Sequence, residues 1–197
     1  GGRGREAQVP ALLELYKIPY TGSDQTTLCI ALDKALTKRI LSTYRIKTPG
    51  YRVISKDKAN LSGKFRFPAI VKPNAEGSSK GISDASVVSC KEELEQLLLK
   101  NLKLYGQDML VEEYIEGREF TVGVLGNGED TRVFPPMEIC YLKQGKYNIY
   151  SYNVKQNFKE YVAYKCPADI PPGVEEKMIA AARKIYDALG CRDFARI

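Results

Sequence analysis

The sequence predicts an α/β or α+β protein, and two observations carry this prediction. Short apolar or alternating segments typical of strands alternate with longer segments of helical periodicity. Strand-like segments dominate after residue 109, which favours an antiparallel part there. The 197 residues are 44% hydrophobic, enough for one core or two small ones. No apolar run approaches the ~18 residues that span a bilayer, so we expect no membrane partner.

The first elements are helical. Apolar residues at helical spacing predict a helix over 5–16, and residues 18–22 follow as a short strand or loop. Ser23 or Asp24 is a suitable N-cap for a second helix that continues to about Leu41.

Strands and a further helix follow. Residues 51–55 are a strand candidate, and residues 68–72 are a short apolar run that suits a buried strand ending in a lysine. Residues 74–83 are expected to form a loop. Residues 89–92, Ser-Cys-Lys-Glu, have the spacing of a capping box and open a helix whose apolar face includes Leu94.

The second half is β-rich until its final helix. Residues 109–115 and 119–125 are strand candidates, and residues 126–130 are a strong turn signal. Residues 174–189 form an amphipathic helix that a glycine ends, and residues 193–197 begin a strand.

Composition excludes several kinds of chemistry. The chain has no histidine, so Ser-His and Cys-His catalysis and most transition-metal sites are excluded. Its five cysteines are widely spaced and include no C-x-x-C pair, which argues against a disulfide framework and a zinc site and favours the cytoplasm. Any chemistry must therefore use Lys, Arg, carboxylates, hydroxyls and backbone amides.

The net charge of +6 comes from an excess of Lys and Arg in the first half of the chain. A basic surface suits either a nucleic acid or a phosphorylated small molecule. Acidic residues are interspersed throughout, and this favours the small molecule. The sequence contains neither a P-loop nor a Rossmann fingerprint, so a bound nucleotide would need another kind of site.

The best phosphate-binding candidate is the segment Glu76-Gly-Ser-Ser-Lys-Gly81. It combines flexible glycines with hydroxyls, backbone amides and a cation, although an ordinary surface turn has the same composition. Lys72 and Lys34 are candidate point charges for phosphate oxygens, and each is also compatible with a solvated surface position.

Two further segments have alternative interpretations. The carboxylates of 111–119 suit an adenine amino group and ribose hydroxyls, or a charged edge strand. Arg192 and Arg196 suit a transferred phosphoryl group, or a surface ion pair with Asp193. Three tyrosines are better interpreted as packing in strands than as platforms for base stacking: Tyr147, Tyr150 and Tyr152.

In order and spacing, these segments resemble the ATP-grasp superfamily, and specifically D-alanine:D-alanine ligases and their close relatives. The resemblance runs nearly end to end. It is carried by Ile18-Pro-Tyr-Thr-Gly-Ser23, Asp33-Lys34, Ile70-Val-Lys-Pro73, Glu76-Gly-Ser-Ser-Lys-Gly81, Val111-Glu-Glu-Tyr-Ile115, Gly117-Arg-Glu-Phe-Thr-Val122 and Gly190-Cys-Arg-Asp-Phe-Ala-Arg-Ile197.

The resemblance implies an ATP-grasp fold, in which two α+β subdomains clamp ATP. We expect the end of an N-terminal domain in 1–30, a small lid subdomain in 31–112 and a large subdomain in 113–197. The implied ATP-binding residues are Lys34, Lys72, Glu76, Ser78, Ser79, Glu112, Glu113, Tyr114, Ile115 and Glu119; the implied catalytic residues are Arg196, Ser78 and Lys155. The lysines would hold phosphates, the serine loop would close over them, and Glu119 would take the ribose hydroxyls.

The reaction that the resemblance implies makes a peptide bond. One D-alanine carboxylate attacks the γ-phosphate of ATP, and the amine of a second then displaces phosphate from the acyl phosphate. Mg²⁺, or Mn²⁺ in its place, neutralises the phosphates. The expected partners are therefore ATP and D-alanine or another amino acid, without nucleic acid, and a homodimer is compatible with the sequence.

Four departures from the family pattern qualify this expectation. The family's metal ligands would lie beyond Ile197 and most of the N-terminal domain is absent, so we expect an incomplete chain that is inactive alone. Residues 4–8 replace a Gly-Glu-Asp-Gly pattern, and Gln156 stands where a tyrosine is usual. The alternatives are a ligase for another amino-acid pair, a non-catalytic nucleotide-binding module and a basic nucleic-acid-binding module.

Overall fold

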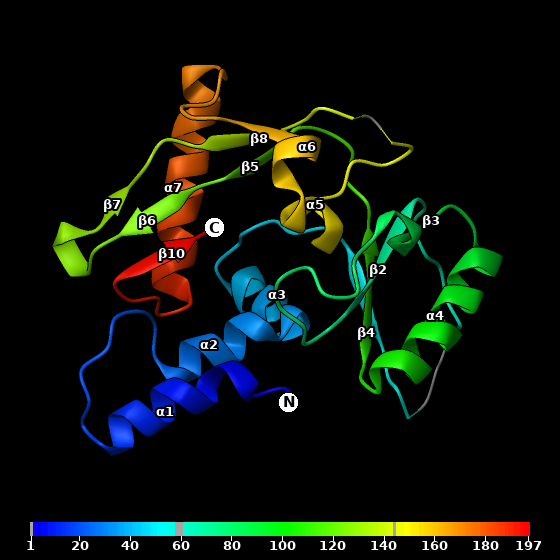
Figure 1. The fold of residues 1–197 in the computed structure, drawn as a ribbon, viewed down its shortest axis with the longest axis horizontal. Coiled ribbons are helices and arrows are strands. Elements are labelled where there is room, and N and C mark those ends of the chain that lie inside the picture. Colours follow the sequence, from blue (N-terminus) through cyan, green and yellow to red (C-terminus); the bar gives the residue numbers. More distant parts are fainter. Residues whose placement is uncertain (1, 58–60, 144) are drawn as a thin grey trace.

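The computed structural model describes residues 2–57, 61–143 and 145–197 (Figure 1). In chain order its elements are η1 (Arg5–Ala7), α1 (Gln8–Leu15), α2 (Gln25–Leu32), α3 (Lys34–Thr43), β1 (Tyr51–Ile54), β2 (Ala69–Pro73), η2 (Asp84–Ser86), β3 (Val87–Val88), α4 (Lys91–Tyr105), β4 (Met109–Glu113), β5 (Glu119–Thr121), β6 (Gly123–Leu125), η3 (Gly128–Asp130), β7 (Arg132–Val133), β8 (Met137–Tyr141), α5 (Tyr152–Gln156), α6 (Phe158–Tyr161), β9 (Val162–Lys165), α7 (Pro172–Ala188) and β10 (Phe194–Arg196). The predicted mixture of helices and strands is confirmed.

The predicted second helix is interrupted at Asp33. Asp24 caps α2, as predicted, by accepting a hydrogen bond from the backbone N–H of Thr27 at 2.8 Å. Asp33 then adopts an extended conformation and caps α3 by accepting from the N–H of Leu36 at 2.9 Å. The apolar periodicity alone does not reveal this break, because both helices continue the same pattern.

Asp33 also joins the start of α3 to the end of β2. The side-chain amide of Asn74 donates to Asp33 Oδ1 at 2.8 Å, and Asn74 Oδ1 accepts from the N–H of Ala35 at 3.0 Å. Both polar side chains are buried. The first turn of α3, which carries Lys34, is therefore held against the loop that follows Lys72.

Asp33→Ala is expected to lower the free energy of unfolding by about 2 to 3 kcal/mol. The substitution removes a helix cap worth about 1 kcal/mol and leaves the buried Asn74 amide without its acceptor. Asp24→Ala removes only a cap and is expected to cost about 1 kcal/mol. Urea denaturation of both variants measures the difference, and equal losses would contradict the second role of Asp33.

The first sheet has the strand order β1-β4-β2-β3, and all its pairings are antiparallel. Helix α4 covers one face and buries Leu94 and Leu98 completely. The predicted capping box is wrong: the N-cap of α4 is Cys90, without a side-chain cap, and Glu93 instead accepts from the N–H of Ser89 at 2.7 Å. Because β1, β2 and β3 pair antiparallel within this sheet, antiparallel pairing begins before residue 109, earlier than the sequence indicates.

Two smaller antiparallel sheets form the other part of the molecule, with the orders β10-β6-β7 and β5-β8-β9. Helix α7 buries Ala182 and Tyr186 against β6, and it ends before Gly190, which has a φ of +66°.

The prediction that three tyrosines pack in strands is wrong. Tyr147 and Tyr150 lie in the connection after β8, and Tyr152 begins the unpredicted helix α5.

The loop over residues 18–24 anchors the N-terminal helices to the strand β10. Asp193 Oδ2 accepts from the N–H of Gly22 at 2.8 Å, and Arg192 donates to the carbonyl of Gly22 at 3.2 Å. Arg192 also lies over the ring of Tyr20, 4.9 Å from its centroid. Arg192 is therefore part of a structural contact between two ends of the chain.

Candidate functional site

A cleft of about 600 Å³ lies between the first sheet and the sheet β5-β8-β9. Its floor is the connection from β4 to β5, and its walls include the apolar side chains of Ile70, Ile139 and Ile149. Many predicted site residues meet in its lining: Lys72, Ser79, Glu112, Glu113, Tyr114, Ile115, Glu119, Lys155 and Arg196.

The register of β2 and β4 places Lys72 beside Glu112. Ile70 lies opposite Glu112, and Lys72 is two residues further along β2, so Lys72 and Glu112 lie on the same face of the sheet. Their side chains form an ion pair. Lys38 approaches Glu112 from α3, with its Nζ 2.9 Å from Glu112 Oε2.

This Lys38–Glu112–Lys72 group is largely withdrawn from water. The exposed side-chain fractions are 10% for Lys38, 8% for Glu112 and 19% for Lys72. Burial alone would raise the pKa of Glu112, but the charge and hydrogen bonds of the two lysines hold it below its usual value. The group carries two ammonium ions and one carboxylate, so it has a surplus positive charge that suits an anion.

Lys34 lies one helical turn before Lys38 but outside the cleft lining. Its Nζ donates to the backbone carbonyls of Pro73 at 3.0 Å and Glu76 at 2.6 Å. Burial, followed by the nearby charge of Lys72, lowers the pKa of Lys34 to about 8. In this structure Lys34 therefore holds the start of the loop after β2.

We expect Lys34 to titrate with a midpoint of about 8, well below an ordinary lysine at about 10.4. Because the unfolded chain then binds more protons, the contribution of Lys34 to the free energy of unfolding rises as pH increases between these values. NMR titration of lysine side-chain carbons measures the midpoint. Lys34→Arg should lack this transition, and a spectrum in which every lysine titrates above 10 would contradict it.

The loop over 76–81 has a constrained backbone. Ser78 and Ser79 have φ values of 54° and 56°, in the left-handed region that few residues other than glycine adopt. At Gly81 a Cβ would lie 2.7 Å from Pro73 Cγ, so only glycine fits. Ser79 Oγ donates to the carbonyl of Tyr150 at 2.9 Å and so joins this loop to the opposite side of the cleft.

Ser78 and Glu76 do not contribute to the cleft lining. Ser78 is exposed. The Glu76 carboxylate accepts from Arg5 at 3.1 Å and from Gln107 at 3.0 Å, beside a second cavity of about 380 Å³. The sequence predicted that Ser78 and Glu76 belong to the loop after β2, but it could not show which way their side chains point.

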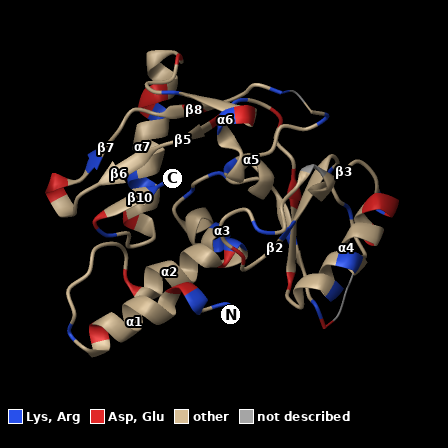
Figure 2. Ribbon diagram, viewed as in Figure 1, with Lys and Arg blue, Asp and Glu red and all other residues tan. Residues whose placement is uncertain are grey.

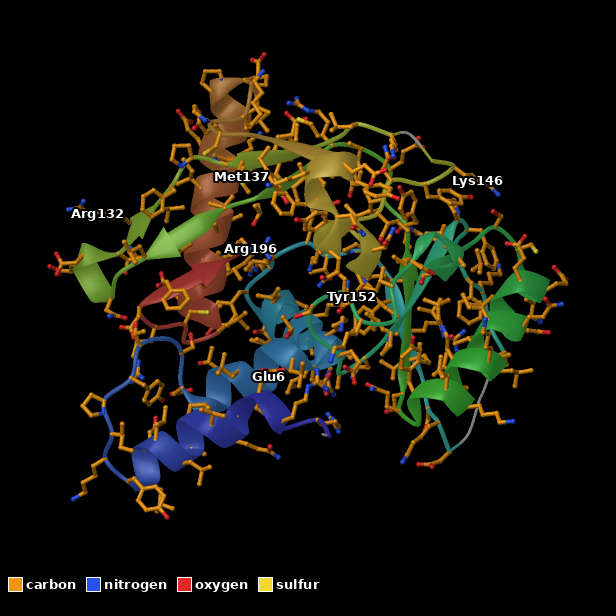
Figure 3. All side chains as sticks on the ribbon, viewed as in Figure 1. Glu6, Arg132, Met137, Lys146, Tyr152 and Arg196 are labelled. Atoms are coloured by element: carbon orange, nitrogen blue, oxygen red, sulfur yellow. The ribbon has the colours of Figure 1, made fainter. Side chains whose placement is uncertain are left out.

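The cleft lining also combines Glu119, Lys155 and Arg196. Burial, then the charge of Arg196, lowers the pKa of Lys155, whereas Glu119 opposes this shift. Arg196 donates weakly to Thr121 Oγ1 at 3.5 Å. Figure 3 shows Arg196 on β10, directed towards the middle of the molecule where Tyr152 begins α5.

Two residues that contact the site, Lys38 and Tyr141, were not predicted from the sequence. Lys38 had a detectable signal, because a residue four positions after Lys34 lies on the same helix face. Tyr141 donates to Glu119 Oε2 at 2.6 Å. This contact depends on how β5 and β8 pair, and nothing in the local sequence indicates it.

Two observations limit the kinds of site that the described residues offer. In residues 2–57, 61–143 and 145–197, no group of three or more Cys, Asp or Glu side chains is placed to hold a metal ion. No helix in the described part of the chain is long and apolar enough to cross a membrane. Figure 2 shows Lys and Arg interspersed with Asp and Glu over both parts of the molecule.

The fold and the cleft define an ATP-grasp protein: two α+β parts face each other across lysines and carboxylates. The chain superposes on a solved D-alanine–D-alanine ligase from Bacillus anthracis, complexed with ATP, with a TM-score of 0.72 and 24% identity, over 98% of this chain and 58% of that one. This similarity confirms the expected fold.

The family itself is shown by sequence. Residues 43–197 match the family described as D-ala D-ala ligase C-terminus, so the chain belongs to the D-alanine–D-alanine ligase family. Its relatives include the D-alanine–D-alanine ligases of Bordetella avium, 34% identical, and Carboxydothermus hydrogenoformans, 37% identical. All of this chain is covered in both matches, but the chain spans only 60% and 62% of the lengths of these relatives.

Proposed function

We propose that the protein is an ATP-dependent ligase that joins two D-alanine molecules into D-alanyl-D-alanine, a precursor of peptidoglycan. The observation that carries this proposal is the convergence of Lys72, Glu112, Glu119, Lys155 and Arg196 on one cleft in a chain of this family. Both relatives are named D-alanine–D-alanine ligase, and this supports D-alanine as the substrate.

In this proposal the residues of the cleft lining have different roles. The surplus positive charge around Lys72 binds the ATP phosphates, and Glu112 to Ile115 line the adenine position. Glu119 accepts hydrogen bonds from the ribose hydroxyls. Arg196 and Lys155 stabilise the charge that develops as a D-alanine carboxylate attacks the γ-phosphate and an acyl phosphate forms.

The loop over 76–81 has a part in the same proposal. Closure of Ser78 and Ser79 over the phosphates would exclude water from an acyl phosphate that hydrolyses readily. Lys34 would act with Lys72 on the phosphates once this loop moves, and Glu76 would help to set the position of the loop.

We propose that Mg²⁺ accompanies the bound ATP, as the resemblance to D-alanine:D-alanine ligases implies. When bound, the ion neutralises phosphate charge. The described residues offer no carboxylate cluster that fits it, so we assign no metal ligand and derive no step from the ion.

We propose further that the chain comprises the three parts predicted from sequence and that the protein is cytoplasmic; a homodimer stays a prediction.

Titration with a non-hydrolysable ATP analogue, with and without Mg²⁺, tests the nucleotide site. Lys72→Met should weaken saturable binding by about tenfold or more, because a charge-assisted contact to phosphate is worth about 1.5 kcal/mol or more. Lys103→Met is the matched control, since Lys103 is an exposed lysine on α4 outside the cleft. Equal binding by both variants, or none by the unaltered protein, would contradict the assignment.

A further inference from the structure

Glu119 has a partner that is not part of the cleft lining. The hydroxyl of Tyr141 donates to Glu119 Oε2 at 2.6 Å. In the pairing of β5 with β8, Glu119 lies opposite Ile139. Tyr141 is two residues further along β8, so its side chain is on the same face as Glu119 and within diagonal reach. The tyrosine therefore reaches Glu119 from the neighbouring strand β8.

Tyr141 is itself held in place by packing. It lies against the buried cluster of Ile139, Val154 and Val162. Burial, reinforced by the hydrogen bond to Glu119, raises the pKa of Tyr141 far above its usual value. The phenol is therefore protonated at physiological pH and remains a hydrogen-bond donor to the carboxylate.

This contact restricts the rotation of the Glu119 carboxylate. With Oε2 held by a donor on β8, the carboxylate samples fewer orientations, and its remaining acceptor positions point in a narrower range of directions. A carboxylate of restricted orientation binds a ligand with a hydroxyl opposite its free acceptor position more tightly than a ligand without one. In the second case the carboxylate oxygen loses a hydrogen bond when the ligand binds. A freely rotating carboxylate on a cleft wall discriminates less.

We propose that Tyr141 is a positioning residue that makes this cleft select ribonucleotides over deoxyribonucleotides. The proposal rests on the proposed function, in which Glu119 accepts hydrogen bonds from the ribose hydroxyls. Tyr141 does not contact the nucleotide; it orients the group that does. Its removal should affect the recognition of the sugar and leave the contribution of the phosphate contacts unchanged.

The experiment is a set of binding titrations with ATP, 2′-deoxy-ATP and 3′-deoxy-ATP on the unaltered protein and Tyr141→Phe. We expect the unaltered protein to prefer ATP over at least one deoxy analogue by about tenfold. Tyr141→Phe should weaken ATP binding by about tenfold and leave the affinity for that analogue within about twofold, so that the preference disappears. A change in folding alone would lower all three affinities together and would not change their ratio.

Tyr164→Phe is the matched control. Tyr164 also carries a hydroxyl bonded to another side chain, that of Tyr150, and it lies on the neighbouring strand β9. It should keep the preference for ATP. Tyr141→Met, which also lacks the hydroxyl, should give the same ratio as Tyr141→Phe and provides a second measurement if the first variant does not fold.

Two outcomes separate this inference from the function on which it rests. If the unaltered protein prefers ATP and both Tyr141 variants keep that preference, the role of Tyr141 is refuted and the nucleotide site stands. If the unaltered protein binds none of the three nucleotides, the proposed function fails and the inference fails with it.

Discussion

Glu112→Gln is expected to lower the free energy of unfolding by about 3 to 5 kcal/mol in the absence of nucleotide. The substitution keeps the shape of the side chain but leaves the ammonium groups of Lys38 and Lys72 in a largely buried position without a carboxylate. Breaking one side of a buried ion pair costs this much because the remaining charge is poorly solvated. Denaturation by urea at pH 7 measures the loss.

Glu113→Gln is the matched control on the same strand. Glu113 pairs with Arg66 at 3.6 Å, and the side chains are 31% and 82% exposed. An exposed ion pair of this kind contributes little, so we expect a change of about 0.5 kcal/mol or less. Similar losses in the two variants would show that burial of the Lys38–Glu112–Lys72 group does not determine its energy.

The effect of Glu112→Gln should also depend on pH. The pKa of Glu112 in the folded protein is lower than its usual value, so its stabilising contribution is complete above the unfolded pKa of about 4.3. As pH falls through the folded pKa, the carboxylate takes up a proton and the contribution disappears. The difference between the unaltered protein and Glu112→Gln should therefore be constant near neutral pH and shrink in acid; a constant difference down to acid pH would contradict this.

Arg196→Met is expected to reduce the turnover of ATP and D-alanine by about 100- to 1,000-fold while leaving the free energy of unfolding nearly unchanged. Loss of one group that stabilises developing charge in a transition state has effects of this size. The stability should persist because the contact of Arg196 with Thr121 is long, at 3.5 Å, and the side chain is exposed. The measurement is kcat for the complete gene product.

Arg192→Met provides the comparison for Arg196. It lies four residues earlier on the chain, and its side chain contacts Gly22 and Tyr20 outside the cleft. We expect it to lower stability but to retain kcat at a temperature where the protein is folded. Equal kcat values for the two variants would exclude Arg196 from the proposed chemistry.

The site could be predicted from sequence where a side chain and its neighbour belong to one local pattern. Lys72 ends a short apolar strand, and Glu112 lies in a second one. In each case the strand period indicates that the charged side chain lies at the end of a buried run. The order of the motifs then indicated the family, which the match over residues 43–197 confirms.

The prediction failed where local signals are shared by different structures. Residues 25–43 have a continuous helical pattern, yet Asp33 divides them because its carboxylate caps α3 and holds Asn74. Residues 147–152 have the aromatic composition of a strand, but in the structure residues 147–151 belong to the connection from β8 to α5, and Tyr152 begins that helix. In both cases contacts with distant residues outweigh the local preference.

The sequence by itself therefore determined the fold class, the family and several of the segments that line the cleft, because these depend on periodicity and on the order of motifs along the chain. Only the tertiary structure decided which side chains meet. In the structure Glu76 bonds to Arg5 outside the cleft, Lys38 contacts Glu112, and Tyr141 donates to Glu119. Such contacts depend on strand register and helix packing, which join residues far apart in the chain and leave no local pattern in the sequence.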